Sequence, residues 1–219
     1  MFDLDDTLWD IRPTIERAER NAYHFLRERY PGVARRYTLE DIRKIREQIY
    51  WSRPAIQHDL TEVRRQTLAY VFQQSGCSAS GVEETLGQFL ADRNRVSLYS
   101  DVVPALTVLS SNYPLVALTD GNSDLNQIGI RQFFVGVISA ASVGYCKPHS
   151  AGFLRACEIA KSEPRHTLHI GDHPLKDVYG AKVVGMKTIL IQRKGASWEN
   201  DYDPDFRVTS LTETVSLLI

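Results

Sequence analysis

The sequence predicts an α/β protein, in which a doubly wound parallel sheet carries an inserted all-helical domain. Two observations favour this fold class. After residue 98, short apolar runs of strand length alternate with helical patterns, which is typical of a parallel sheet covered on both faces. Between residues 10 and 97 the pattern is helical only. We therefore expect a core formed by residues 1–9 and 98–219, and a helical domain formed by residues 10–97.

The first strand is expected at the start of the chain, where Met1 and Phe2 precede Asp3, Asp5 and Thr7 at alternate positions. Residues two apart lie on the same side of an extended chain, so Asp3 and Asp5 both point beyond the strand end. A buried parallel strand usually has about five or more residues. We therefore expect strand residues upstream of Met1 to be missing from this sequence, and a destabilised core if they are truly absent.

The helical stretch contains four expected helices. Apolar residues recur at intervals of three and four up to Leu26, and Pro31-Gly32 ends the first helix. Thr38 followed by Asp41 indicates a capping box at the start of the second helix. Between residues 12 and 65 there are thirteen Arg or Lys against eight Asp or Glu. A basic helical domain beside an acidic core would suit an anionic substrate.

The remaining elements alternate between strand and helix. Strands are expected at residues 114–119, 135–139, 167–170, 187–192 and 206–208, and helices at 102–111, from about 123, at 150–160, from about 173 to 184, and at the end of the chain. Ligands in such sheets bind beyond the carboxyl ends of the strands. Polar residues stand at those ends: Thr119 closes one run, Lys147 follows another, and Gly171-Asp172 closes a third.

Composition limits the class of protein. The 219 residues are 43% hydrophobic and 24% charged, with a net charge of −1, which is ordinary for a globular protein and gives no reason to expect nucleic acid or a membrane as partner. No apolar run approaches the ~20 residues that a bilayer span requires. Cys77, Cys146 and Cys157 show neither disulfide nor zinc spacing, so we expect reduced thiols and a cytoplasmic location.

An Asp-rich turn after a strand is often a solvated loop or a helix cap. Here it is followed in order by Thr119, by Lys147, and by Gly171-Asp172 with Asp177 five residues further on. Together these residues resemble the four signature motifs of the haloacid dehalogenase-like hydrolase superfamily, over the whole chain. The resemblance implies a Rossmann-like core with an inserted helical cap domain, and a Mg²⁺-dependent phosphomonoesterase.

The resemblance and the chemistry of the residues agree on the roles. Asp3 is expected to be the nucleophile that forms an aspartyl-phosphate, and Asp5 the general acid and then base. The resemblance implies that Mg²⁺ is held by the Asp3 carboxylate, the Asp5 backbone carbonyl and Asp172. The other expected site residues bind the phosphate or support the metal and the lysine; they are Thr119, Asp120, Gly121 and Lys147 for the phosphate, and Thr7 and Asp177 for support.

Asp5 also separates the chemistries of this superfamily. The dehalogenases lack an acid two residues after the nucleophile, because halide departs without a proton, so Asp5 favours phosphoryl transfer. The start of the chain and the helical stretch resemble bacterial phosphatases that act on flavin mononucleotide (FMN) or on the phosphoribitylamino-uracil intermediate of riboflavin synthesis. Candidate contacts with the leaving group are Trp9, Trp51, Arg53, His58 and Arg64.

Two other functions remain open. A phosphomutase would pass the phosphoryl group from Asp3 to a second hydroxyl, and a regulatory protein of the same fold would bind without turnover. The expected partner is a small-molecule phosphate ester, with no nucleic acid and no membrane, and the expected assembly is a monomer or homodimer.

Overall fold

The computed structural model describes residues 1–193 and 202–219. Within them the chain divides into two compact units. The core unit comprises Met1–Asp10, Ser97–Gly121 and Ile128–Ile219, and the helical unit comprises Ile11–Val96 and Asn122–Gln127. The short segment Asn122–Gln127 belongs to the helical unit, although it lies far along the chain from the four long helices of that unit.

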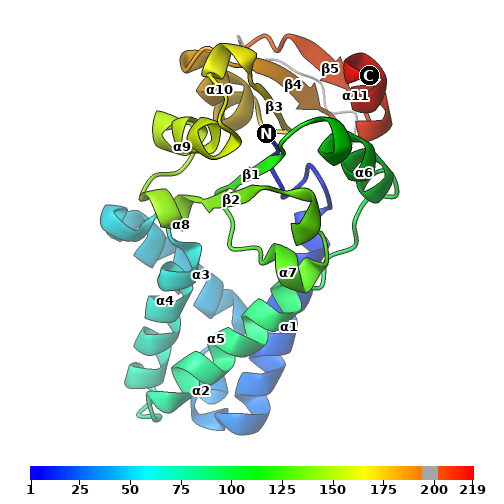
Figure 1. The fold of residues 1–219 in the computed structure, drawn as a ribbon. Helices are drawn as coiled ribbons and strands as arrows, with labels where there is room; N and C mark the ends of the chain where they lie inside the picture. The colour runs from blue at the N-terminus through cyan, green and yellow to red at the C-terminus, as the bar shows by residue number, and fades with distance from the viewer. Residues whose placement is uncertain (194–201) are drawn as a thin grey trace. The chain divides into compact units, whose positions relative to one another are not determined.

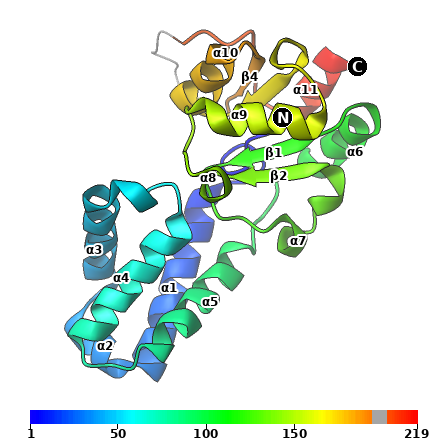
Figure 2. The same ribbon diagram turned by 60° about the vertical axis from the view of Figure 1, so that its left-hand side comes forward.

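The core unit is built on a parallel sheet (Figures 1 and 2). Its strands are β1 (Val116–Thr119), β2 (Gly136–Ser139), β3 (Leu168–Gly171), β4 (Lys187–Ile191) and β5 (Phe206–Val208). β1 pairs with β2, and β3 pairs with β4, which pairs with β5, always in parallel. This topology agrees with the predicted α/β class.

Residues 1–3 lie between β1 and β3. Phe2 forms parallel bridges to Ala117 of β1 and to Ile170 of β3. The amide of Phe2 donates to the carbonyl of Val116 (2.9 Å), and the amide of Asp3 donates to the carbonyl of Ile170 (2.9 Å). Short as it is, the start of the chain therefore takes the central strand position, which gives the order β2, β1, residues 1–3, β3, β4, β5.

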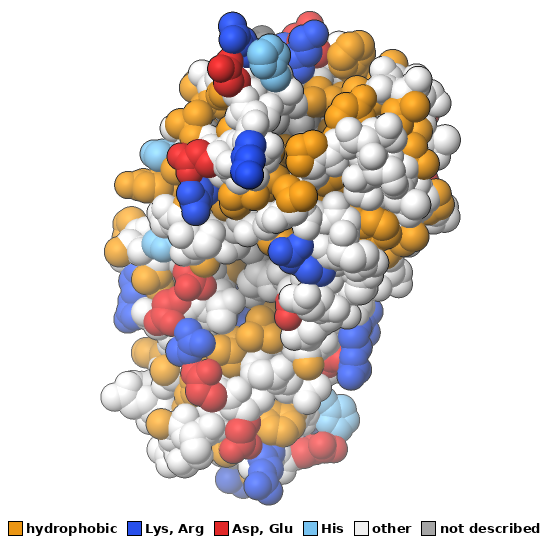
Figure 3. All heavy atoms as spheres, viewed as in Figure 1, with side chains coloured by type: hydrophobic (Ala, Val, Ile, Leu, Met, Phe, Trp, Pro, Cys, Tyr) orange, Lys and Arg blue, Asp and Glu red, His pale blue; other side chains and the backbone are white. Residues whose placement is uncertain are grey.

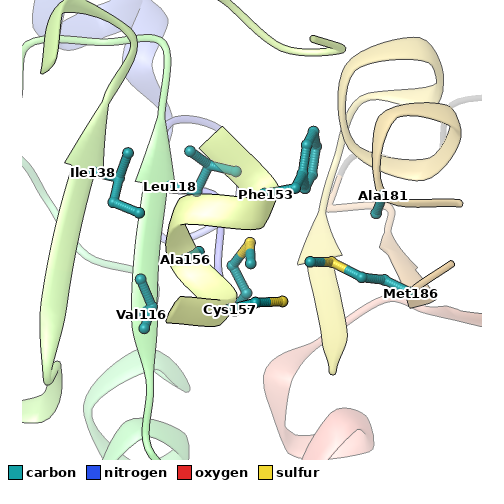
Figure 4. Close-up of a cluster of buried hydrophobic side chains, with 9 residues drawn as sticks. Val116, Leu118, Ile138, Phe153, Ala156, Cys157, Ala181 and Met186 are labelled. Carbon is teal, nitrogen blue, oxygen red and sulfur yellow. The ribbon is translucent and has the colours of Figure 1, made fainter. Parts of the chain in front are cut away.

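Helices cover both faces of the sheet, as expected for a doubly wound fold. α9 (Ser150–Ala160) packs on β1 and β2, and α10 (Gly180–Val183) packs on α9 and β4, while α6 (Val102–Asn112) and α11 (Leu211–Leu218) pack on each other. Figure 4 shows the apolar cluster between the sheet and α9 and α10. The labelled residues are Val116, Leu118, Ile138, Phe153, Ala156, Cys157, Ala181 and Met186. This packing holds the ends of the strands in fixed register.

The helical unit contains α1 (Ile11–Arg29), α2 (Pro31–Arg36), α3 (Leu39–Ser52), α4 (Leu60–Gln74) and α5 (Ser80–Arg93). The predicted capping box of α3 is present, with Thr38 and Asp41 each accepting from the other's backbone amide. α1 packs most extensively on α5, and α3 and α5 both pack on α4. The apolar cluster of this unit is lined by Leu26, Val33, Ile42, Leu68, Val71, Phe72, Val82 and Leu86.

Four short elements differ from the expectation. Pro31-Gly32 does not only end α1, because it also opens α2; proline is well tolerated at the first position of a helix. The expected helix near residue 123 begins at Leu125 and is short, as α7 (Leu125–Ile128), and a further short helix, α8 (Ala140–Val143), follows β2. The stretch after β3 opens as a π-helical turn over Pro174–Tyr179 before α10 begins.

The surface carries mixed charge. Figure 3 shows acidic and basic side chains interspersed on the face drawn. Within the helical unit much of the basic excess is paired, as where Arg65 meets both Glu62 and Glu83. Of the helices in the described part of the chain, none is long and apolar enough to cross a bilayer.

Candidate active site

Asp3 lies at the carboxyl end of the short central strand segment, next to the end of β3. Its backbone amide is bonded to the carbonyl of Ile170, so Asp3 is held beside Gly171 and Asp172. The Asp3 carboxylate is buried. Thr7, four residues further on, donates its hydroxyl to Asp3 Oδ2 (3.1 Å) and to Asp172 Oδ1 (3.4 Å). The turn after the first strand therefore bends back and ties the two carboxylates together.

Lys147 joins this group from the loop that follows α8. Its Nζ donates to Asp3 Oδ1 (2.5 Å) and to Asp177 Oδ1 (2.5 Å), and its side chain is only 4% exposed. Burial alone would lower the pKa of Lys147, but the carboxylates of Asp177 and Asp3 outweigh that effect and raise it. The ammonium therefore stays charged, and it holds both carboxylates in place.

Three carboxylates converge at this point. One oxygen each of Asp3, Asp172 and Asp177 lies within 4.8 Å of the others. Burial raises the pKa of Asp3 well above its ordinary value; Lys147 acts in the opposite direction, and Asp177 and Asp172 add to the rise. Burial, Asp177 and Asp6 raise the pKa of Asp172 to about 7. Such crowded negative charge is what a bound cation relieves.

Asp177 has a different position within the group. Burial would raise its pKa, but Lys147 and the hydrogen bond from His169 outweigh burial and lower it. His169 Nε2 lies 2.9 Å from Asp177 Oδ1, and the amide of His173 donates to Asp177 Oδ2 (3.0 Å). With three donors directed at its two oxygens, Asp177 is fixed as the partner of Lys147 rather than left free for a metal.

Gly171 allows this arrangement. A Cβ on Gly171 would lie 2.3 Å from Asp177 Cγ, closer than real Cβ atoms approach any heavy atom. The glycine in the Gly171-Asp172 pair is therefore required by the close approach of Asp177, which lies six residues after it. The presence of glycine at this motif position thus has a steric reason.

Thr119 ends β1 and is buried. Its hydroxyl accepts from the amide of Gly121 (2.9 Å), which closes the turn that follows the strand. Asp120 Oδ1 accepts from the backbone amide of Lys147 (2.9 Å), and Lys176 Nζ lies 3.2 Å from Asp120 Oδ2. Asp120 thus ties the turn after β1 to the lysine-bearing loop.

Trp9 is wholly buried, so it offers no exposed ring for stacking on a leaving group. Its indole N–H donates to Asp5 Oδ1 (2.9 Å). Of the candidate contacts named from the sequence, Trp9 is the one that lies in the core unit.

The other four candidates lie in the helical unit and differ in exposure. Trp51 is 67% exposed and meets Tyr50 edge to face. Arg53 is exposed and bonds to Gln66, and His58 is partly buried. Of these side chains, Trp51 presents the large exposed aromatic surface on which a ligand could stack.

Arg64 points inward instead. It stacks over the ring of Phe89, with the guanidinium carbon 3.4 Å from the ring centroid, and reaches Glu19 at 3.4 Å. Burial lowers the pKa of Arg64 to about 9, with a further contribution from Arg46. Its place beside Glu19 is that of a structural ion pair within the helical bundle.

Two residues of the site neighbourhood were not anticipated. His169, on β3, forms a hydrogen bond with Asp177. A histidine inside an otherwise apolar strand was the feature of the sequence that could have indicated this role. Arg193 donates from Nε and Nη2 to the carbonyl of Thr7 (3.1 and 3.0 Å) and pairs with Asp101 (2.7 Å), which fixes the turn after Asp3. No spacing links Arg193 to the motifs, because only the fold brings it there.

Comparison with known proteins gives concordant results. The model of the haloacid dehalogenase-like hydrolase family matches residues 1–185. Among curated relatives, 5-amino-6-(5-phospho-D-ribitylamino)uracil phosphatase YigB of Escherichia coli (strain K12) is 31% identical over 225 residues, covering 99% of this chain and 94% of the relative. Glyceraldehyde 3-phosphate phosphatase of Methanopyrus kandleri is 28% identical over 231 residues, covering 100% and 95%.

Solved structures resemble the chain over nearly its full length. A 2-haloacid dehalogenase from Pseudomonas syringae pv. Tomato DC3000 superposes with a TM-score of 0.93 at 31% identity, covering 99% of this chain and 96% of that one. A HAD phosphatase from Thermococcus onnurineus gives a TM-score of 0.69 at 25% identity, covering 99% and 95%.

Proposed function

Because this chain belongs to the haloacid dehalogenase-like hydrolase family, we propose that it hydrolyses a small phosphate monoester by way of a phosphoryl group carried on Asp3. The relatives named as phosphatases support a phosphoric monoester hydrolase. The observation that carries the proposal is the buried group in which Lys147 bridges Asp3 and Asp177 beside Asp172.

In the proposed reaction the Asp3 carboxylate attacks the phosphorus, and the bond to the leaving oxygen breaks. Asp5 protonates that oxygen and afterwards takes a proton from the water that attacks the phosphoaspartyl group. Lys147, already hydrogen-bonded to Asp3, stabilises the negative charge that develops on the transferring phosphoryl group. Thr119 and the turn at Asp120 and Gly121 would bind the phosphate oxygens.

The residues present fit a Mg²⁺ ion. The donors are carboxylate oxygens, which are the ligands that Mg²⁺ prefers. Asp3 and Asp177 share the Lys147 ammonium with Asp172 close by, and burial, Asp177 and Asp6 raise the pKa of Asp172, so a divalent cation would neutralise the remaining charge. Asp3, the Asp5 carbonyl and Asp172 would hold the ion, with Thr7 and Asp177 in support. When bound, it would shield the negative charge between nucleophile and phosphate.

For the substrate we propose FMN or the phosphoribitylamino-uracil intermediate of riboflavin synthesis. The proposal rests on the resemblance to YigB over almost the whole of both chains. The helical unit would act as the cap domain, with Trp51, Arg53 and His58 as contacts with the leaving group. Three free cysteines agree with a reducing, cytoplasmic location.

A second candidate reaction is dehalogenation, because the Pseudomonas structure of similar fold is described as a 2-haloacid dehalogenase. Both reactions would begin with attack by Asp3. Asp5 favours the phosphatase, since only an alkoxide leaving group needs a proton.

The test is product release from a panel of substrates: FMN, nucleoside monophosphates, sugar phosphates and 2-chloropropionate. We expect inorganic phosphate from FMN, loss of activity with a chelator, and no activity in Asp3→Asn, whose fold is checked by circular dichroism. Chloride release without phosphate release would contradict the proposal. Phosphate release led by a sugar phosphate would overturn only the flavin assignment, and isomerised sugar phosphate without free phosphate would indicate a mutase.

A further inference from the structure

The buried indole of Trp9 is in contact with the side chain of Asp5. Trp9 is completely buried, and its Nε1 donates to Asp5 Oδ1 at 2.9 Å. The two residues also form a parallel bridge, Trp9 bridges Leu98 on its other side, and the amide of Asp6 donates to the carbonyl of Trp9 (2.8 Å). The backbone of Trp9 is therefore held on both sides, and burial together with the hydrogen bond to Asp5 gives the indole N–H a fixed direction.

We infer that Trp9 is a positioning residue for Asp5. Its indole N–H selects which carboxyl oxygen of Asp5 carries the transferable proton. The inference rests on the proposed role of Asp5 as general acid. An indole N–H can only donate, so Oδ1 must accept whether Asp5 is ionised or protonated. The carbonyl oxygen of a protonated carboxyl group accepts better than its hydroxyl oxygen, so in the acid form the proton resides on Oδ2, and this is the oxygen that delivers it to the leaving group.

A buried tryptophan needs some acceptor for its N–H, and in most proteins a backbone carbonyl supplies it. Here the acceptor is the side chain of Asp5, a half-buried aspartate two residues after the proposed nucleophile. That choice removes torsional freedom from the Asp5 carboxyl group before substrate arrives. A group already oriented for proton transfer avoids an entropic cost at the moment of reaction.

The readout is the dependence of kcat/KM on the leaving group, because kcat/KM reports the step in which the leaving oxygen departs. Trp9→Phe keeps an aromatic ring and removes the N–H. With alkyl phosphates, whose leaving oxygen needs a proton, we expect kcat/KM to fall about 10- to 100-fold. With p-nitrophenyl phosphate, whose phenolate leaves unaided, we expect a fall of less than about 3-fold.

Asp5→Asn and the double variant provide the control. If Trp9 acts through Asp5, then Trp9→Phe has no further effect on alkyl phosphate hydrolysis once Asp5 is asparagine. An equal fall for both classes of substrate, or full additivity of the two changes, would overturn the inference. Wild-type protein that releases phosphate from neither class would instead refute the proposed function.

A second replacement guards against loss of folding in Trp9→Phe. β-(3-Benzothienyl)alanine at position 9 keeps the bicyclic shape and has sulfur where the indole has N–H. We expect it to retain the melting temperature of the wild type and to reproduce the selective loss with alkyl phosphates. Wild-type kinetics on both substrate classes in this variant would contradict the inference.

Discussion

His169 shows how one buried side chain supports the site without reaching it. It donates to Asp177, which in turn holds Lys147 against Asp3. Burial lowers the pKa of His169 to about 4, although the hydrogen bond to Asp177 acts in the other direction. The imidazole is therefore neutral at neutral pH, with its proton on Nε2.

This neutrality predicts a pH dependence of stability. An unfolded chain binds a proton at His169 near pH 6.5, whereas the folded chain does so only near pH 4. Between these values the unfolded state holds more protons, so the free energy of unfolding falls as the pH falls. The contribution of this residue should decrease by about 2 kcal/mol between pH 7.5 and pH 5.

Urea unfolding of wild type and His169→Gln at both pH values measures this contribution. Glutamine can still donate to Asp177 but does not titrate. The pH dependence that arises from all other groups is therefore the same in both proteins and cancels when their free energies of unfolding are subtracted. We expect the stability difference between the two proteins to shrink by about 2 kcal/mol at pH 5. A difference that stays constant with pH would show that His169 is not held neutral by the fold.

Residue types and spacing predicted which side chains meet, but not how the aromatic ones are used. Asp3, Lys147 and Asp172 could be grouped in advance because each follows a parallel strand, and such ends share one edge of a sheet. Trp9 could not be placed that way. A tryptophan near a site can stack on a ligand or fill the core, and only the fold, which buries it behind Asp5, decides between these positions.

Within the helical unit, Glu19 on α1 joins three helices. It is 4% exposed and pairs with Arg43 and Arg46 of α3 and with Arg64 of α4. Burial alone would raise the pKa of Glu19, but Arg46, Arg43 and Arg64 outweigh it and lower the pKa. The carboxylate is therefore ionised, and it offsets the repulsion among three guanidinium groups.

Glu19→Gln keeps the shape of the side chain and removes its charge. We expect the free energy of unfolding to fall on the order of 2 kcal/mol, between the effects typical of exposed and buried pairs, because Arg43 and Arg46 remain partly hydrated. The matched control is Glu16→Gln, which breaks an exposed pair with Arg12 on the same helix and should cost less than about 0.5 kcal/mol. Equal losses in urea unfolding would contradict a structural role for Glu19.

The boundaries of helices and strands were predicted correctly where neighbouring residues in the sequence define them. α9 and β5 begin and end at the predicted residues, because periodicity and flanking polar residues define them. α2 was missed because Pro31-Gly32 also reads as a helix end. The π-helical turn after His173 has no local signal in the sequence; it carries Asp177, which accepts a hydrogen bond from the distant Lys147.

At the scale of the whole molecule, the proposed chemistry depends on four distant segments of the core unit. They contribute the Asp3 turn, the end of β1, the Lys147 loop, and the end of β3 with Asp177. The alternation of strand and helix predicted this convergence, and the fold class agrees. Residues 122–127 were expected in the core unit, and tertiary contacts place them with the helices; Asn122 accepts from Arg93 and donates to Thr61.

The most direct test of the proposed chemistry is to look for the phosphoryl group on Asp3. Enzyme mixed with Mg²⁺ and FMN, or the best substrate of the panel, is quenched in acid within a single turnover and digested for mass spectrometry. We predict that the N-terminal peptide gains the mass of one phosphoryl group at Asp3, and that Asp3→Asn shows no such gain. Rapid phosphate release with an unmodified Asp3 peptide at every quench time would contradict covalent catalysis by this residue.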